Sequence, residues 1–150
     1  AMFSIIQFDL PGGKVLDLFG GTGQLGIEAL SRGASQAVFV DAGDAACRLI
    51  KENLKRTRLE NQAKVVRSDY LEFLDRCKDK FDIIFLDPPY AEVFLETSLN
   101  RIREIDILQT NGIIVTERPV GKDLAFSCDS LDRSKDHKYS KTLVTIFRKR

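Results

Sequence analysis

The sequence predicts an α/β domain built on a parallel sheet of five strands, with a C-terminal antiparallel hairpin and helices on both faces. Three observations predict this fold class. Short apolar runs alternate with amphipathic runs, glycines or prolines separate them, and the alternation stops after Gly121, where two strand-like runs follow each other. A chain of 150 residues is long enough to bury the core of one such domain, so we expect residues 1–150 to form a single domain.

The expected elements follow from hydrophobic periodicity. The apolar runs that predict parallel strands are 14–18, 37–40, 63–66, 81–86 and 112–116. The run 81–86 is apolar almost throughout, which is typical of a central strand covered on both faces. The runs that predict helices are 24–32, 44–57, 70–77 and 93–108. Cys47, Ile50 and Leu54 form the apolar stripe of the second helix. Two further runs, around 131–139 and 142–147, leave no room for a helix between them and must therefore be antiparallel.

Composition excludes several classes of protein. No apolar run approaches the roughly 20 residues of a membrane span, and the first ten residues lack the features of a signal peptide, so we expect a cytoplasmic protein without a membrane partner. The three cysteines are widely spaced and His137 is the single histidine, which argues against a disulfide framework and a metal site. We expect His137 to be solvated or to face RNA rather than to act as a catalytic base.

The net charge of +1 does not by itself predict a nucleic-acid partner, but the basic residues are unevenly distributed. The segment 133–150 contains seven Lys and Arg against one acid, and a second group lies on the expected helix 44–57 and just after it. Such groups can neutralise phosphates, or they can be the solvated surface of an ordinary domain. Charge alone favours neither interpretation.

A glycine-rich loop joins the first expected strand to the first expected helix. Its core is Phe19-Gly20-Gly21-Thr22-Gly23, and glycines here let the backbone turn tightly and let a ligand approach closely. The spacing Gly21-x-Gly23-x-x-Gly26, with Asp41 at the end of the next strand, also satisfies the dinucleotide-binding pattern. The loop therefore leaves two cofactors open, NAD and S-adenosylmethionine.

Asp17 favours S-adenosylmethionine. It stands at the carboxyl end of the first strand, directly before the loop, where its charge would repel a pyrophosphate. S-adenosylmethionine instead offers an ammonium group and a sulfonium, which a carboxylate attracts.

The motif Asp87-Pro88-Pro89-Tyr90 follows the expected central strand and indicates the chemistry. Two prolines fix the backbone and remove two N–H donors, so this turn presents mainly acceptors. An exocyclic amino group on a base carries two N–H donors. Accepting both, at the Asp87 carboxylate and the Pro88 carbonyl, would aim the nitrogen lone pair at an activated methyl group. Tyr90 offers a flat face on which the base can stack.

With both motifs in view, the chain resembles the RsmD-type bacterial 16S rRNA (guanine-N2)-methyltransferases, a family of Rossmann-like class I S-adenosylmethionine-dependent enzymes. The segments that carry the resemblance are DLFGGTGQLGIEALSRGA (17–34), FDIIFLDPPY (81–90) and GIIVTE (112–117). The resemblance implies S-adenosyl-L-methionine as cofactor and small-subunit rRNA as partner, possibly within an assembling ribosomal particle. It also implies that the chain begins partway into such a protein, after a basic N-terminal hairpin that helps to hold RNA.

The resemblance also implies roles for individual residues. Asp17 would contact the methionine amine, with Phe19, Gly20, Gly21 and Gly23 shaping the loop around the cofactor. The ribose hydroxyls would bind Asp41, although the family usually has Glu there. The adenine would lie beside Asp69 and Tyr70, and the segment 87–90 would hold the target amine.

Three alternatives stay open at this point. The amine-binding turn is shared by enzymes that methylate adenine N6 or cytosine N4. The glycine pattern also suits an NAD(P)-dependent oxidoreductase, and a non-catalytic RNA-binding module could retain the same fold.

Overall fold

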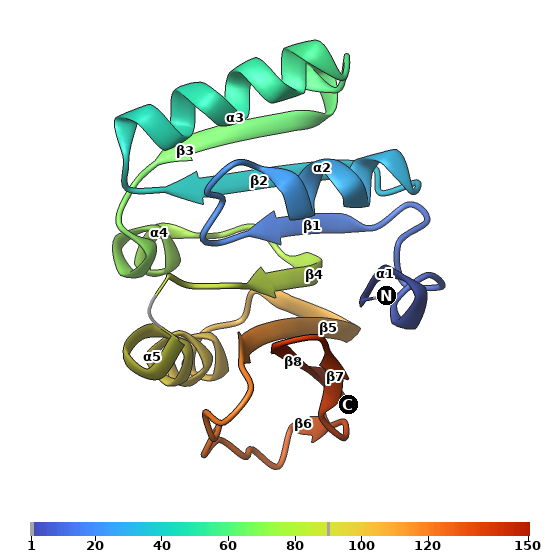
Figure 1. Ribbon diagram of the computed structural model, residues 1–150, viewed down its shortest axis with the longest axis vertical. Coiled ribbons are helices and arrows are strands. Elements are labelled where there is room, and N and C mark those ends of the chain that lie inside the picture. Colours follow the sequence, from blue (N-terminus) through green and yellow to red (C-terminus); the bar gives the residue numbers. More distant parts are fainter. Residues whose placement is uncertain (1, 90) are drawn as a thin grey trace.

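The computed structural model describes residues 2–89 and 91–150, and within them it contains a single mixed sheet with the strand order β3-β2-β1-β4-β5-β8-β6, with β7 also paired to β8 (Figure 1). The strands are β1 (Lys14–Asp17), β2 (Gln36–Asp41), β3 (Ala63–Arg67), β4 (Phe81–Leu86), β5 (Leu108–Pro119), β6 (Leu131–Arg133), β7 (His137–Tyr139) and β8 (Thr142–Lys149). The helices are α1 (Met2–Ile5), α2 (Gln24–Ser31), α3 (Asp44–Arg56), α4 (Tyr70–Arg76) and α5 (Ala91–Glu104), and a 3-10 turn η1 spans Glu60–Gln62.

The parallel half of the sheet confirms the predicted fold class. Strand β1 pairs in parallel with both β2 and β4, and these pair in parallel with β3 and β5. The carboxyl ends of β1, β2 and β4 therefore point to the same edge of the sheet (Figure 1). Because the chain leaves β1 in one direction and returns to β4 on its other side, the carboxyl ends of these two strands flank the crevice where open α/β sheets bind ligands.

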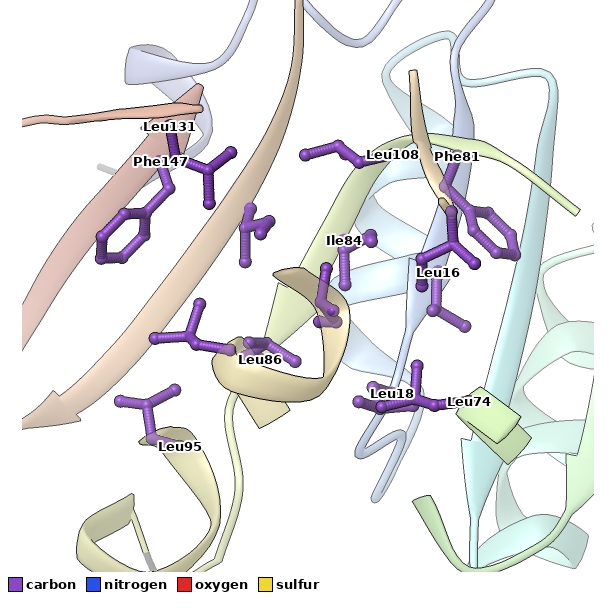
Figure 2. Close-up of a cluster of buried hydrophobic side chains, with 14 of the residues drawn as sticks. Leu16, Leu18, Leu74, Phe81, Ile84, Leu86, Leu95, Leu108, Leu131 and Phe147 are labelled. Atoms are coloured by element: carbon purple, nitrogen blue, oxygen red, sulfur yellow. The ribbon is translucent and has the colours of Figure 1, made fainter. Parts of the chain in front are cut away.

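Apolar side chains cover both faces of the sheet, as expected for central parallel strands. On one face, Leu16 and Ile84 belong to the same buried cluster as Leu74 of α4 and Leu95 of α5 (Figure 2). On the other face, residues of β1, β2 and β4 pack against α1, α2 and α3. The buried residues of α3 are Cys47, Ile50 and Leu54, which confirms the stripe predicted for that helix.

The expected helix 93–108 is wrong at its carboxyl end. Helix α5 stops at Glu104, and β5 already begins at Leu108, opposite Phe81. The Phe81 amide donates to the Ile107 carbonyl at 2.8 Å. Ile107 and Leu108, which were expected to continue the apolar stripe of the helix, are therefore held next to β4 instead. Strand β5 is accordingly much longer than the expected 112–116.

The expected strand-like run 131–139 is also corrected. It forms two short strands, β6 and β7, which pair with the same edge of β8 on either side of residues 134–136. Asp136 in this interruption accepts hydrogen bonds from the buried Arg118 at 3.0 Å and from the Thr145 hydroxyl at 2.6 Å. A buried guanidinium needs such partners, and Asp136 supplies one from the interruption between the two short strands. Strands β7 and β8 form the predicted hairpin.

Within residues 2–89 and 91–150, no helix is long and apolar enough to cross a membrane, and no group of three candidate ligands could hold a metal ion.

Candidate active site

The glycine loop is held tightly against β2. The Gly20 amide donates to the Val40 carbonyl at 2.8 Å, and a Cβ on Gly20 would lie 2.8 Å from Cδ1 of Ile50. Gly21 and Gly23 have φ angles of 58° and 84°, which side chains rarely allow. Gly23 is the N-cap of α2, and a Cβ at this position would lie 3.3 Å from Cγ2 of Ile50.

Asp17 lies beneath this loop and is completely buried. Its Oδ2 accepts a hydrogen bond from the Gly26 amide at 3.2 Å, whereas its Oδ1 has no hydrogen-bond partner among the described residues. Burial, opposed by the hydrogen bond from the Gly26 amide and reinforced by the charges of Asp87 and Asp41, raises the pKa of Asp17 to about 7. A buried carboxylate that lacks a partner favours a cationic or hydrogen-bond-donating ligand.

A cavity of about 610 Å³ opens at the carboxyl ends of the parallel strands. This volume lies within the range of small-molecule and cofactor sites. Eight of the twelve site residues expected from the sequence line it, namely Phe19, Gly20, Gly21, Asp41, Asp69, Tyr70, Asp87 and Pro89. Asp17, Gly23 and Pro88 are buried and are not among the residues that line the cavity, and Tyr90 lies outside the described residues.

Asp41, at the end of β2, is oriented by two backbone amides. Its Oδ2 accepts from Gly21 and its Oδ1 accepts from Gly43, each at 2.9 Å. Every carboxylate oxygen can accept more than one hydrogen bond, so both remain able to bind hydroxyl groups in the cavity. These amides fix the carboxylate in place before a ligand arrives.

Asp69 is the N-cap of α4, where its Oδ2 accepts from the amides of Leu71 and Glu72 at 3.0 and 3.2 Å. This cap fixes the carboxylate at the cavity wall.

An aromatic cluster lies beside Asp69. The ring centroids of Phe19 and Tyr70 are 5.0 Å apart, and the Phe94 ring lies 5.4 Å from Tyr70 and 6.2 Å from Phe19. Three rings beside an oriented carboxylate suit a flat heterocycle that carries an amino group. Phe94 was not expected from the sequence, because its position on α5 cannot be told from an ordinary core contact.

A pair of carboxyl groups lines the cavity beside β4 and β5. Asp87 follows β4, and Glu117 lies on the neighbouring strand β5; the two side chains share a hydrogen bond and both line the cavity. Partial burial and the charge of Asp87 raise the pKa of Glu117 to about 8, and partial loss of surrounding water raises the pKa of Asp87, although Asp87 as a whole residue is exposed. Glu117 was missed as a site residue. The sequence does contain an indication of this role, since Glu117 is an acidic residue directly after the expected strand 112–116, which pairs with the strand that precedes Asp87.

The basic residues of 133–150 are largely used within the fold. Four of the seven form ion pairs with aspartates: Arg133 with Asp136, Arg148 with Asp9, Lys149 with Asp106 and Arg150 with Asp132. On α3, Arg48 and Arg56 pair with Asp44 and Glu52 one turn away. Surface pairs of this kind are weak, so they leave these side chains able to exchange partners.

Comparisons with known proteins place this geometry in a family. The family model described as Conserved hypothetical protein 95 matches residues 1–148. The chain is 39% identical to YlbH of Bacillus subtilis (strain 168) over 153 residues, covering all of this chain and 83% of YlbH. It is 34% identical over 114 residues to Ribosomal RNA small subunit methyltransferase D of Haemophilus influenzae, covering 74% of this chain and 59% of that protein.

Solved structures show the same likeness. A conserved hypothetical protein of Streptococcus pyogenes superimposes with a TM-score of 0.91 at 32% identity, over 99% of this chain and 93% of that one. The crystal structure of SMU.776, described as a putative methyltransferase complexed with SAH, has a TM-score of 0.75 at 17% identity over 97% of this chain and 49% of that one, and therefore shows the shared fold alone. From the extent of the family match and the identity to these relatives, the chain belongs to the Conserved hypothetical protein 95 family, the RsmD-type methyltransferases.

Proposed function

We propose that this protein transfers a methyl group from S-adenosyl-L-methionine to the exocyclic N2 of a guanine in small-subunit rRNA. The observation that carries the proposal is one cavity lined by Asp41, Asp69 and Asp87, where Asp41 ends β2, Asp69 lies just after β3 and Asp87 follows β4, on the other side of β1 in the sheet. The names of the relatives support it, because those of Haemophilus influenzae and Escherichia coli (strain K12) are ribosomal RNA small subunit methyltransferases.

The residues present fit S-adenosylmethionine. Asp17 stands directly before the glycine loop, and its Oδ1 has no hydrogen-bond partner among residues 2–89 and 91–150, which suits the methionine ammonium group, reached directly or through a water. Asp41 would accept the two ribose hydroxyls, and Asp69 would accept from the adenine amine while Tyr70 and Phe94 flank the ring. The cofactor, when bound, supplies a methyl group already activated by a positive sulfur.

The turn after β4 would hold the acceptor. Asp87 reaches the cavity, and the buried Pro88 fixes the backbone that presents its carbonyl. Asp87 and this carbonyl would accept the two N–H groups of the target amine, so that the nitrogen lone pair faces the methyl group. Catalysis would then consist of positioning and electrostatics, with no covalent intermediate. Tyr90, for which we expect stacking on the base, lies outside the described residues.

We propose that the partner is rRNA, and specifically small-subunit rRNA within an assembling ribosomal particle. Exposed cations on and next to α3 support contact with phosphates, namely Lys51, Lys55 and Arg58. The net charge of +1 implies that such contact is local rather than spread over the whole surface.

The test separates cofactor binding from turnover. Calorimetry with S-adenosylhomocysteine and with NAD should give binding for the first alone. Asp87→Ala should lower methylation of rRNA at least about a hundredfold, the usual scale for a lost electrostatic contact in a transition state, with cofactor affinity nearly unchanged. Asp123→Ala, at an exposed position outside the cavity, is the matched control. Binding of NAD would instead indicate an oxidoreductase, and normal turnover in Asp87→Ala would refute the role of the turn.

A further inference from the structure

Glu117 occupies a defined place beside the amine-binding turn. Leu86 pairs with Thr116 in the register of β4 and β5, so the next residues along the two strands, Asp87 and Glu117, stand side by side. Side chains alternate along a strand, and both therefore lie on the sheet face of Phe85 and Val115. Both also line the proposed active-site cavity.

Two carboxyl groups in this position cannot both be ionised without strong repulsion, and a hydrogen bond between them requires a proton. Burial and then the charge of Asp87 raise the pKa of Glu117 to about 8. Loss of surrounding water also raises the pKa of Asp87, but the hydrogen bond from Glu117 acts against that rise. The shared proton therefore resides on Glu117 at neutral pH, and Asp87 is the ionised member.

The remaining surroundings of the pair reinforce this arrangement. Asp17 on β1 faces it from the other neighbouring strand and adds a further negative charge next to Glu117. None of the salt bridges found in residues 2–89 and 91–150 involves Asp17, Asp87 or Glu117. Without a cation alongside, a retained proton is what limits the charge at this end of the cavity.

We propose that Glu117 is a positioning residue for methyl transfer: its protonated carboxyl donates to one oxygen of Asp87 and thereby directs the other oxygen at the target amine. This inference rests on the proposed function. The reaction consumes no proton of Glu117. The amine nitrogen uses its lone pair to form a bond to the methyl carbon as the carbon–sulfur bond breaks, and the electrons of the broken bond stay on sulfur. The nitrogen then loses one proton to Asp87 or to solvent.

A pH dependence follows. Above the pKa of about 8, Glu117 loses its proton, so the donor disappears and a second negative charge repels Asp87. The contribution of Glu117 is therefore present below that pH and lost above it. Gln at this position offers a permanent N–H donor of nearly the same shape, whereas Ala offers none.

The experiment compares the pH profiles of kcat/KM for rRNA methylation in the wild type, Glu117→Gln and Glu117→Ala, between about pH 6 and about pH 9.5. We expect wild-type activity to fall at the alkaline end. Glu117→Gln should stay within about threefold of the neutral wild-type value and keep that value at alkaline pH. Glu117→Ala should stay about tenfold below the neutral wild-type value at every pH, as for one lost hydrogen bond. Glu60→Gln, on the exposed turn η1, is the control.

A second measurement does not depend on turnover. The side-chain carboxyl ¹³C signal of Glu117 should titrate near pH 8 in the cofactor-free protein and at lower pH in Asp87→Asn, where the neighbouring charge is gone. A Glu117→Gln variant as slow as Glu117→Ala would overturn the proposal, as would a Gln variant that keeps the alkaline fall of the wild type. A wild type that methylates no RNA would refute the proposed function instead, and the titration would then still decide whether the pair shares a proton.

Discussion

Replacing Asp17 by Asn should stabilise the cofactor-free protein while weakening cofactor binding. The carboxyl is completely buried, and one of its oxygens has no hydrogen-bond partner in the part of the chain that the structure describes, so ionising it in the folded state is unfavourable. Asn has nearly the same shape and keeps an oxygen to accept from the Gly26 amide, but it carries no charge. It therefore removes the unfavourable ionisation and also the attraction for a cationic ligand.

The magnitude follows from the pKa of Asp17, which is raised from 3.8 to about 7. A shift of about three units, at about 1.4 kcal/mol each, destabilises the fold by about 4 kcal/mol above pH 7. The Asn amide leaves a buried N–H group unpaired, which costs about 1–3 kcal/mol. The net gain in the free energy of unfolding is about 2 kcal/mol, or about 4–8 °C in Tm for a domain of this size.

The sign of the pH dependence is fixed by the direction of the shift. Between pH 3.8 and about 7 the folded state binds the Asp17 proton and the unfolded state does not, so wild-type stability falls as the pH rises through this window. The advantage of Asp17→Asn should therefore be near zero at pH 5 and fully developed at pH 8.

Urea unfolding of the cofactor-free wild type, Asp17→Asn and the exposed control Asp123→Asn at both pH values checks this dependence. Equal differences between Asp17→Asn and wild type at pH 5 and pH 8 would refute the reasoning, as would normal affinity of Asp17→Asn for S-adenosylhomocysteine.

Two further predictions concern the loop and the ribose site. Gly26→Ala should lower the free energy of unfolding by about 1–3 kcal/mol in urea, because the new Cβ would lie 2.3 Å from Cε2 of Phe39 and force α2 away from β2; an unchanged midpoint would contradict this packing. Asp41→Ala should weaken S-adenosylhomocysteine binding by about 1–3 kcal/mol in calorimetry, since it removes the acceptor held by the Gly21 and Gly43 amides; unchanged affinity would exclude the ribose role.

The parallel part of the fold could be predicted from the sequence because its signals are local. Strand 81–86 is apolar except for Asp82 and is bounded by charged residues and prolines, and the structure has β4 with those bounds. The glycine loop and Asp41 could be assigned to one site because strand ends in a parallel sheet meet at one edge, which the register of β1 with β2 satisfies.

The misassigned parts depend on tertiary contacts. Ile105 stands three residues after Ile102 and continues the helical spacing, so periodicity cannot reveal that α5 ends at Glu104 and that Leu108 pairs with Phe81. Likewise, nothing local marks Asp136 as the partner of Arg118, which interrupts the edge strand. The structure of these segments is determined by contacts with residues that are distant in the sequence.

Site residues that belong to a sequence motif were predicted, whereas site residues that are recognised only by their spatial neighbours were missed. Asp87 stands in a recognisable turn, whereas Glu117 gains its importance only from lying beside Asp87 on the next strand. Phe94 similarly gains its role from the Tyr70 ring 5.4 Å away. The roles assigned to these residues stay predictions until the variants are measured.

The most direct test of the central claim is the identity of the methylated atom. Small-subunit RNA, free or in a partly assembled particle, would be incubated with this protein and isotopically labelled S-adenosylmethionine, then digested to nucleosides for mass spectrometry. The account predicts label in N2-methylguanosine at one position in the wild type, and none in Asp87→Ala. Label in N6-methyladenosine or N4-methylcytidine would contradict the proposed substrate, and no labelled nucleoside in any RNA would contradict the proposed reaction itself.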